Sequence, residues 1–242
     1  IRKMIMQWQP QLKNLFVAVI IIIVPSVLIA KQPDLGTAVL ITSSGIIAIF
    51  LSGIKLAHIF LGIGLVIGAI PLLWSFMYEY QKSRILSFFS PNQDALGSGY
   101  HLAQSKISLG SGGLFGKGYM NGTQSQLDFL PENHTDFIFS AFGEEFGFMG
   151  VIILITLYVL VALRGMSISI KATDNFSRIL SATLILTIFL YVLVNIGMVV
   201  GILPIVGAPL PFMSYGGTSM LTVFAALGII MSIKSHQRLM RK

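Results

Sequence analysis

Long apolar runs alternate with shorter polar connections along this chain of 242 residues. A helix rises about 1.5 Å per residue, so about 20 apolar residues cross a hydrocarbon core about 30 Å thick. Six runs reach or approach that length: 14–30, 35–52, 56–77, 137–163, 179–203 and 218–233. The pattern therefore predicts an all-α, polytopic membrane protein with six transmembrane helices.

Polar positions divide the predicted helices into two groups of three. Residues 1–77 carry the first three helices and residues 137–242 carry the last three. Between them, residues 78–136 form one long hydrophilic segment with an amphipathic start, a glycine-rich middle and apolar or aromatic residues throughout. Connections of this length are usually functional or disordered. The apolar content favours a functional loop over a plain linker.

Composition agrees with a membrane protein and narrows the chemistry. The chain is 55% hydrophobic and 10% charged, with a mean hydropathy of +0.84, outside the range of soluble domains. It has no cysteine, which excludes disulfides, thiolate nucleophiles and cysteine-ligated metals within it. It starts at Ile1 rather than Met and shows no signal-peptide pattern, so we expect an amino-terminal portion to be missing.

The distribution of charge predicts the orientation, because lysine and arginine concentrate in cytoplasmic segments of membrane proteins. If both ends are cytoplasmic, the inner segments carry eleven cations and one acid, and the outer segments carry five cations and eight acids. The inner total of +10 and the outer total of −3 account for the net charge of +7. We therefore predict that residues 78–136 are extracytoplasmic and that the basic residues face membrane lipid rather than nucleic acid.

The stretch LPENHTDFIFSAFGEEFGFMG, which begins at Leu130, places acids beside an apolar run. Asp136 lies just before the predicted helix, where an acid can cap free N–H groups without any further function. Small residues then recur at steps of 4, 3, 4 and 3: Ser140, Gly143, Gly147 and Gly150. Such a stripe lets another helix approach closely, and it would place Asp136 at the outer mouth of a helix bundle.

Glu144 and Glu145 lie deeper in the same run. Glu144 is on the flank of the small-residue stripe, and Glu145 lies about 100° further around the helix. Ionisable groups at membrane depth line a cavity or find a partner, so we expect a partner for one or both, or a place at headgroup level for one. The four histidines, at 58, 101, 134 and 236, are scattered and no H-E-x-x-H occurs, so no metal site is predicted.

Two further stretches combine polar residues with irregular backbone. In AKQPDLGT, Asp34 stands at the outer start of the second predicted helix, near Lys31, where it fits a helix cap with a local ion pair. The stretch GILPIVGAPLPFMSYGG has enough proline and glycine to break a continuous helix. Broken backbone at membrane depth is tolerated where it lines a cavity or is buried in protein, so Ser214 is placed to reach the outer mouth.

The external segment offers cations and glycines. Its start, YEYQKSRILSFFSP, fits an amphipathic interfacial helix in which Arg84 meets either headgroups or substrate. In GSGGLFGKGYMNG the phosphate-loop pattern fails, and no dinucleotide-binding fingerprint is present. The stretch is either a flexible, turn-rich loop or an anion site built from backbone N–H groups with Lys106 and Lys117.

Three of these stretches, QPDLGT, LPENHTDFIFSAFGEEFG and GILPIVGAPLPFMSYGG, resemble the SEDS family of cell-wall polymerases in order and spacing. The glycine-rich stretch resembles the elongation branch of that family more than the division branch. The resemblance covers essentially the whole chain and implies that it corresponds to the last six of ten transmembrane helices. It also implies a glycosyltransferase of the bacterial cytoplasmic membrane that polymerises lipid II on the outer face.

The resemblance implies partners and a mechanism as well. The expected partners are a class B penicillin-binding protein, which cross-links the product, and other elongation-complex proteins. The match of HTDFIF assigns the essential loop aspartate to Asp136, which we expect to act as general base on the acceptor hydroxyl. We expect Lys106, Lys117 and Arg84 to bind the diphosphate, and Asp34, His134 and Ser214 to orient the substrate. No covalent nucleophile or organic cofactor is required, and a divalent cation is left open.

Two other functions remain open from the residues alone. Broken helices and polar groups at membrane depth also describe a lipid II flippase. A scaffold for the penicillin-binding protein would need no catalytic residue. Polymerase ranks first, flippase second and scaffold third.

Overall fold

The computed structural model describes residues 12–32, 34–54, 98–127 and 134–239, with single positions 58, 61, 62, 64, 68, 71, 74, 75, 77, 81, 82, 86 and 132. The described residues are helical and contain no strand. The helices are α2 (Leu12–Ala30), α3 (Leu35–Leu51), α6 (Ser98–Ser111), α7 (Thr123–Gln126), α8 (Ile138–Ile170), α9 (Asn175–Val200) and α10 (Gly217–Leu239). The predicted all-α class is confirmed for this part of the chain.

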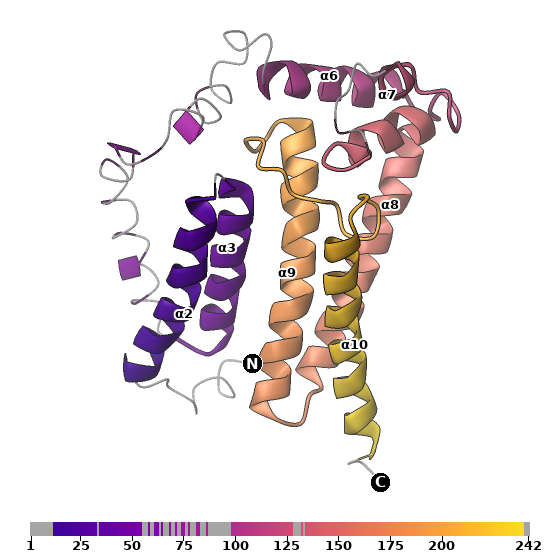
Figure 1. Ribbon diagram of the computed structural model, residues 1–242. Helices are drawn as coiled ribbons and strands as arrows, with labels where there is room; N and C mark the ends of the chain where they lie inside the picture. The colour runs from indigo at the N-terminus through magenta and orange to yellow at the C-terminus, as the bar shows by residue number, and fades with distance from the viewer. Residues whose placement is uncertain are drawn as a thin grey trace.

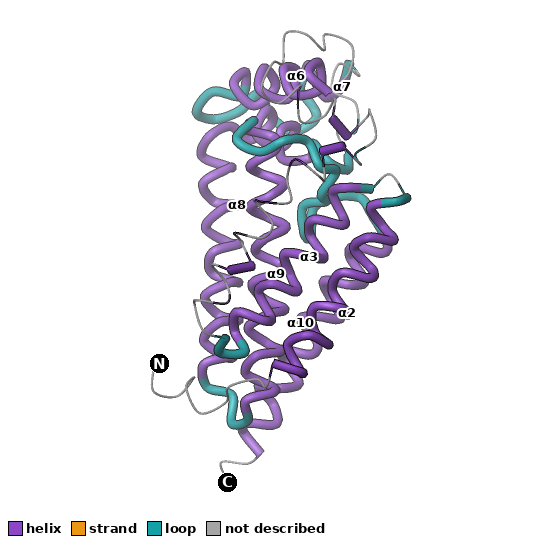
Figure 2. The backbone as a smooth tube through the Cα atoms, turned by 90° about the vertical axis from the view of Figure 1, so that its left-hand side faces the viewer, coloured by secondary structure: helices purple, strands orange, loops and turns teal. Residues whose placement is uncertain are grey.

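The helices form an upright group with two short helices across one end. Figure 1 shows α2 and α3 as one pair and α8, α9 and α10 as another group, with α6 and α7 lying across the ends of α8 and α9. Figure 2 shows the same crossing of α6 and α7 from the side. The α3 helix contacts α9, which joins the two groups. The loop helices therefore cover one end of the bundle.

Among the described residues, three helices are long and apolar enough to cross a membrane: Ile138–Ile170, Asn175–Val200 and Gly217–His236. Two shorter apolar helices cover Leu15–Ala30 and Leu35–Leu51. Large apolar side chains along α8 are exposed, among them Ile153, Leu157 and Leu163, as expected of a surface that faces lipid. The membrane class is thereby supported. The predicted helix at 56–77 lies mostly outside the described residues, so six spans remain a prediction.

Local chemistry explains several helix ends. Asp34 is the N-cap of α3, and its carboxylate accepts hydrogen bonds from the N–H and hydroxyl of Thr37 at 3.0 and 2.6 Å. Asp174 is the N-cap of α9 and accepts from the N–H of Ser177 at 2.8 Å. At the other end of α9, Gly201 adopts a left-handed conformation with φ +83°, which glycine permits without strain. The predicted capping role of Asp34 is confirmed.

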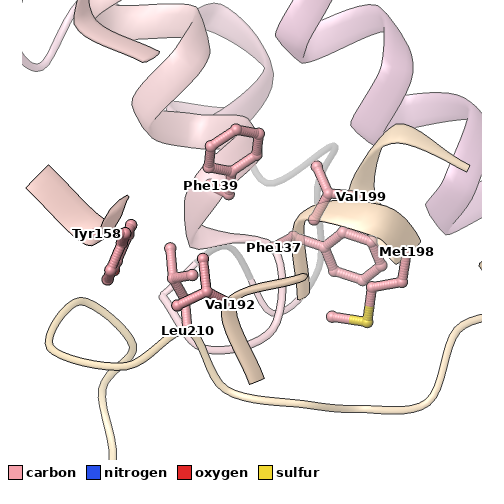
Figure 3. Packing of buried hydrophobic residues seen from close by; sticks show 7 residues of the cluster. All are labelled: Phe137, Phe139, Tyr158, Val192, Met198, Val199 and Leu210. Carbon is pink, nitrogen blue, oxygen red and sulfur yellow. The ribbon is translucent and has the colours of Figure 1, made fainter. Parts of the chain in front are cut away.

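The main core joins α8 and α9 to the connection between α9 and α10, as Figure 3 shows. It consists of buried side chains: Phe137, Phe139, Tyr158, Val192, Met198, Val199 and Leu210. A smaller cluster of Ile168, Ile185 and Ile230 packs α8, α9 and α10 together elsewhere. Because Phe137 follows Asp136 directly, burying its ring fixes the backbone of the acidic stretch.

The α8 helix is not continuous, although the sequence predicts an unbroken run. Gly147 has φ 65° and ψ −169°, which lies outside the helical region. We call residues 144–149 the α8 break. The small residues before it are closely packed, because a Cβ on Gly143 would lie 2.3 Å from Cδ1 of Leu109 on α6. The predicted close approach of another helix is therefore confirmed, whereas an unbroken small-residue stripe is not.

Candidate active site

The connection between α9 and α10, residues 201–216, is irregular as predicted, and we call it the α9–α10 segment. Side chains satisfy parts of its backbone. Nδ2 of Asn195 donates to the carbonyl of Ala208 at 2.7 Å, and the hydroxyl of Tyr158 donates to the carbonyl of Pro211 at 2.5 Å. Oγ of Ser214 accepts from the N–H of Leu210 at 2.7 Å. These bonds give broken backbone a defined shape within the protein.

The same segment holds the backbone that precedes α8. Nδ2 of Asn195 also donates to the carbonyl of Asp136 at 2.8 Å. Ser214 donates through Oγ to the carbonyl of Thr135 at 2.6 Å, and the N–H of Tyr215 donates to the carbonyl of His134 at 2.9 Å. The carbonyls of His134 and Thr135 are thus fixed to the α9–α10 segment, and the carbonyl of Asp136 is fixed to Asn195 of α9.

Asp136 is half-buried and faces this segment. A Cβ on Gly207 would lie 3.3 Å from Oδ2 of Asp136, and Gly207 has φ +70°. Phe137, rather than Asp136, occupies the N-cap position of α8, so the interpretation of Asp136 as the helix cap is not supported. The carboxylate is presented beside a turn in which glycine leaves room for it.

Lys106 approaches the α9–α10 segment from α6. A Cβ on Gly201 would lie 2.5 Å from Nζ of Lys106. The neighbouring Ser105 anchors α6, since its Oγ donates to the carbonyl of Val199 at 2.9 Å and its carbonyl accepts from Oγ of Ser140 at 2.6 Å. Lys106 therefore lies beside Gly201, and Asp136 lies beside Gly207 of the same segment.

Lys117 has a different partner. Its Nζ lies 2.6 Å from Oε1 of Glu144, which is fully buried, and 2.8 Å from Oγ1 of Thr123. The expected partner for a glutamate in this helix is therefore found. The structure brings Lys106, but not Lys117, to the α9–α10 segment, so diphosphate binding by Lys117 remains a prediction that must compete with an ion pair.

The glycine-rich loop, residues 112–122, uses its N–H groups within the protein. The N–H groups of Gly116, Lys117 and Gly118 donate to the carbonyls of Gly112, Glu144 and Glu145 at 2.8, 3.0 and 3.0 Å. These three donors are not available to a ligand, so an anion site built from them is wrong. A free, flexible loop is also not what the structure shows here, because the loop is paired with the α8 break.

Three of the remaining predicted residues, Asp34, His134 and Ser214, lie near the α9–α10 segment or within it. Asp34 is the N-cap of α3. The first turn of α3 lies against the α9–α10 segment, because a Cβ on Gly36 would clash with the carbonyl of Val206. His134 is exposed, and Ser214 is 4% exposed. Arg84 lies outside the described residues. Within the described ranges, no group of three or more His, Asp or Glu side chains could hold a metal ion.

A largely apolar cavity of about 390 Å³ adjoins the α9–α10 segment, between α3, α9 and α10. Thr37, Tyr191 and Ser214 contribute hydroxyl groups to its lining. Ser214 therefore contacts both this cavity and the backbone beside Asp136. Asn195, Tyr158 and Gly207 are not among the predicted site residues. Asn195 could have been identified from the sequence, because an amide side chain inside an apolar run indicates a buried polar contact.

Known proteins with similar sequences identify the family of this chain. Residues 1–239 match the family profile described as FtsW/RodA/SpoVE, cell cycle protein. The chain belongs to the FtsW/RodA/SpoVE family. The resemblance to SEDS proteins is thereby confirmed, and the apolar helices fit the membrane proteins of that family.

Two relatives and one solved structure illustrate the match. Peptidoglycan glycosyltransferase MrdB of Escherichia coli K12 is 50% identical over 234 residues, which cover 96% of this chain and 63% of MrdB. A probable peptidoglycan glycosyltransferase FtsW of Trichlorobacter lovleyi is 40% identical over 214 residues, covering 88% and 55%. A chain of a peptidoglycan synthase complex that coordinates polymerization and crosslinking is 25% identical, with a TM-score of 0.77 and coverage of 96% and 63%. The chain thus spans less than two thirds of each of these relatives.

Proposed function

We propose that this chain carries the catalytic aspartate of a peptidoglycan glycosyltransferase that polymerises lipid II during cell elongation. The observation that carries the proposal is the fixed position of Asp136, whose stretch is bound through three successive carbonyls, two of them to the α9–α10 segment and that of Asp136 itself to Asn195 of α9. The 50% identity with E. coli MrdB supports the same reaction class and the elongation branch.

In the proposed reaction, a sugar hydroxyl of lipid II attacks the anomeric carbon of a glycan linked to lipid diphosphate. The new glycosidic bond forms as the bond from the anomeric carbon to the phosphate oxygen breaks, and the lipid diphosphate leaves with the electron pair. The hydroxyl proton passes to the carboxylate of Asp136. General-base catalysis of this kind contributes about 10² to 10⁴ in rate, and a single displacement needs no covalent intermediate.

Lys106 of α6 is the first candidate for stabilising the negative charge of the leaving diphosphate, because it lies beside Gly201 of the α9–α10 segment. Arg84 is a second candidate for the diphosphate. Contact by Lys117 would require its ammonium to leave Glu144, so Lys117 ranks below Lys106. Asp34 at the start of α3, His134 in the acidic stretch and Ser214 in the α9–α10 segment orient the substrate.

The proposal includes a topology. Residues 1–77 and 137–242 each contribute three transmembrane helices with both chain ends in the cytoplasm of a bacterium, and residues 78–136 form the extracytoplasmic loop. The product is passed to a class B penicillin-binding protein. A complex that coordinates polymerization and crosslinking supports this partner, because its polymerase-like chain has the same fold.

The test uses the full-length protein in detergent or vesicles with purified lipid II. Asp136→Asn is expected to lower the rate of glycan formation by about 10² or more, and Lys106→Ala is expected to raise KM for lipid II. Asp174→Asn is the matched control, because asparagine caps a helix as well as aspartate does and Asp174 lies at the opposite end of α9. Polymerisation by Asp136→Asn at the wild-type rate would reject the proposal.

A lipid II flippase is the second candidate, and the two interruptions of apolar helices favour it. Vesicles that contain the full-length protein and labelled lipid II separate the two functions. A polymerase lengthens glycan without moving lipid between leaflets, whereas a flippase moves lipid without lengthening glycan. A protein that does neither, and whose Asp136→Asn variant supports normal growth, acts as a scaffold.

A further inference from the structure

Glu144 is the most heavily hydrogen-bonded buried acid among the described residues. Its carboxylate is 0% exposed. Oε1 lies 2.6 Å from Nζ of Lys117, and both oxygens lie within 3.2 Å of the N–H of Gln124. Three hydroxyl groups also donate to the carboxylate at 3.1–3.3 Å: Ser108, Ser111 and Thr123. The side chain of Glu144 in α8 therefore contacts α6, the glycine-rich loop and the start of α7.

Backbone pairing surrounds this carboxylate. At the α8 break the carbonyls of Glu144 and Glu145 accept from the loop, and the N–H groups of Phe148 and Met149 donate to the carbonyls of Gly113 and Leu114 at 2.9 and 3.1 Å. The break thus regains from the loop the hydrogen bonds that it loses within α8. The loop is close enough that a Cβ on Gly112 would lie 2.1 Å from the carbonyl oxygen of Gly143.

The energetics make the ion pair a condition of this packing. A buried carboxylate costs several kcal/mol unless charge and hydrogen bonds offset it. If Lys117 left, the fully buried carboxylate of Glu144 would lose the ammonium group that lies 2.6 Å from it. The pair therefore stabilises the docked loop, and the docked loop keeps Lys117 in place.

The consequence for the site runs through α6. Ser108 and Ser111, which donate to Glu144, follow Lys106 by two and five residues on the same helix. We propose that Glu144 is a positioning residue: with Lys117 it fixes α6 against the α8 break and so holds Lys106 beside Gly201. This inference rests on the proposed function and assigns Lys117 to Glu144 rather than to the substrate.

The first test is a double-mutant cycle in the full-length protein with purified lipid II. Glu144→Gln is expected to raise KM by about tenfold and to change kcat far less, because Lys106 contacts the substrate in the ground state as well. In a Lys106→Ala background the same change is expected to add less than about twofold. Full multiplication of the two effects would overturn the proposal. Glu145→Gln, on the neighbouring half-buried glutamate, is the matched control and is expected to keep wild-type kinetics.

The second test distinguishes an ion pair from a substrate contact. Lys117→Met leaves a buried charge and is expected to impair the enzyme by about tenfold or more. Adding Glu144→Gln removes that charge and is expected to restore much of kcat/KM. If Lys117 bound the diphosphate, the double variant would be no better than Lys117→Met, and that result would overturn the proposal.

A third measurement does not depend on activity. Spin labels are attached at Ile107→Cys on α6 and Ile202→Cys in the α9–α10 segment, and the distance between them is measured. Both side chains are exposed, and the chain has no cysteine of its own. In a full-length background free of other cysteines, the distance distribution is expected to broaden in Glu144→Gln and not in Glu145→Gln. An unchanged distribution overturns the positioning role even if polymerisation is established. A broadened one supports it even if Asp136→Asn rejects the proposed function.

Discussion

The α8 break and the α9–α10 segment both depart from regular helix, and the backbone groups of the two regions are satisfied in different ways. At the α8 break, the backbone of the glycine-rich loop pairs with the backbone of α8 around the buried pair of Lys117 and Glu144. In the α9–α10 segment, the carbonyls and N–H groups are satisfied by side chains, chiefly Asn195, Ser214 and Tyr158. The α8 break is therefore held by hydrogen bonds between two backbone segments, whereas the α9–α10 segment is held by hydrogen bonds from individual side chains.

The difference indicates different roles. Backbone pairing through glycines leaves little space, since added Cβ atoms at Gly112, Gly116 and Gly147 would all meet backbone atoms within 2.2 Å. The α9–α10 segment instead uses donors that also bind the carbonyls beside Asp136. We therefore expect changes at the α8 break to act on stability and on Lys106, and changes at the segment to act on the carboxylate.

The largest expected effect tests the close packing of the α8 break. Gly116 has φ +79°, and a Cβ there would lie 2.1 Å from the carbonyl oxygen of Glu145. Gly116→Ala is expected to cost more than about 3 kcal/mol of unfolding free energy, read as a loss of folded protein and of thermal stability.

Gly113 supplies the matched control for that prediction. It also has a positive φ, +56°, but nothing lies within 4 Å of an added Cβ. Gly113→Ala is therefore expected to cost only the backbone strain, about 1–2 kcal/mol. Equal stability of the two variants would show that the loop is not packed on α8 as described.

The next effect tests whether the α9–α10 segment controls Asp136. Asn195→Leu keeps a side chain of similar size but removes the donor to the carbonyls of Asp136 and Ala208. Each unsatisfied buried carbonyl costs about 1–3 kcal/mol, so the loss of the donor to two carbonyls should lower the unfolding free energy by about 2–6 kcal/mol. The rate of glycan formation should fall further than the loss of folded protein explains. An intact rate would separate Asn195 from the site.

Part of this architecture could be predicted from the sequence because it is local. Apolar runs predict α2, α3, α8, α9 and α10, and the cap at Asp34 needs only its own turn. The partner of Glu144 could not be predicted, because Lys117 is 27 residues away and meets it only after the loop docks. In the sequence, a glycine such as Gly147 cannot be assigned to a helix-packing stripe or to a helix break, because both situations favour a residue without a Cβ.

The site follows the same division. The assignment of Asp136 came from its resemblance to family motifs, not from its position before a helix, which also suits a cap. Asn195 was detectable as an amide in an apolar run, but its two acceptors belong to segments on either side of it in the fold. Tertiary hydrogen bonds of this kind leave no periodic signal in the sequence.

A smaller effect is expected at Ser214, which joins the N–H of Leu210 to the carbonyl of Thr135. Ser214→Ala leaves both groups without this partner and is expected to cost about 1–2 kcal/mol and to lower the polymerisation rate. The control is Ser219→Ala, because Ser219 donates only within its own turn, to Gly216 at 2.9 Å. Similar losses in the two variants would argue that Ser214 acts on the segment alone and not on the Asp136 stretch.

The smallest effect is expected at Tyr158, whose hydroxyl reaches the segment from α8 at the carbonyl of Pro211. Tyr158→Phe retains the buried ring in the main core and removes one hydrogen bond, so the unfolding free energy should fall by about 1 kcal/mol. The kinetics should change little, because this bond does not touch the stretch from His134 to Asp136. A drop in polymerisation as large as that of Asn195→Leu would mean that the whole segment, rather than its bonds to the acidic stretch, sets the position of Asp136.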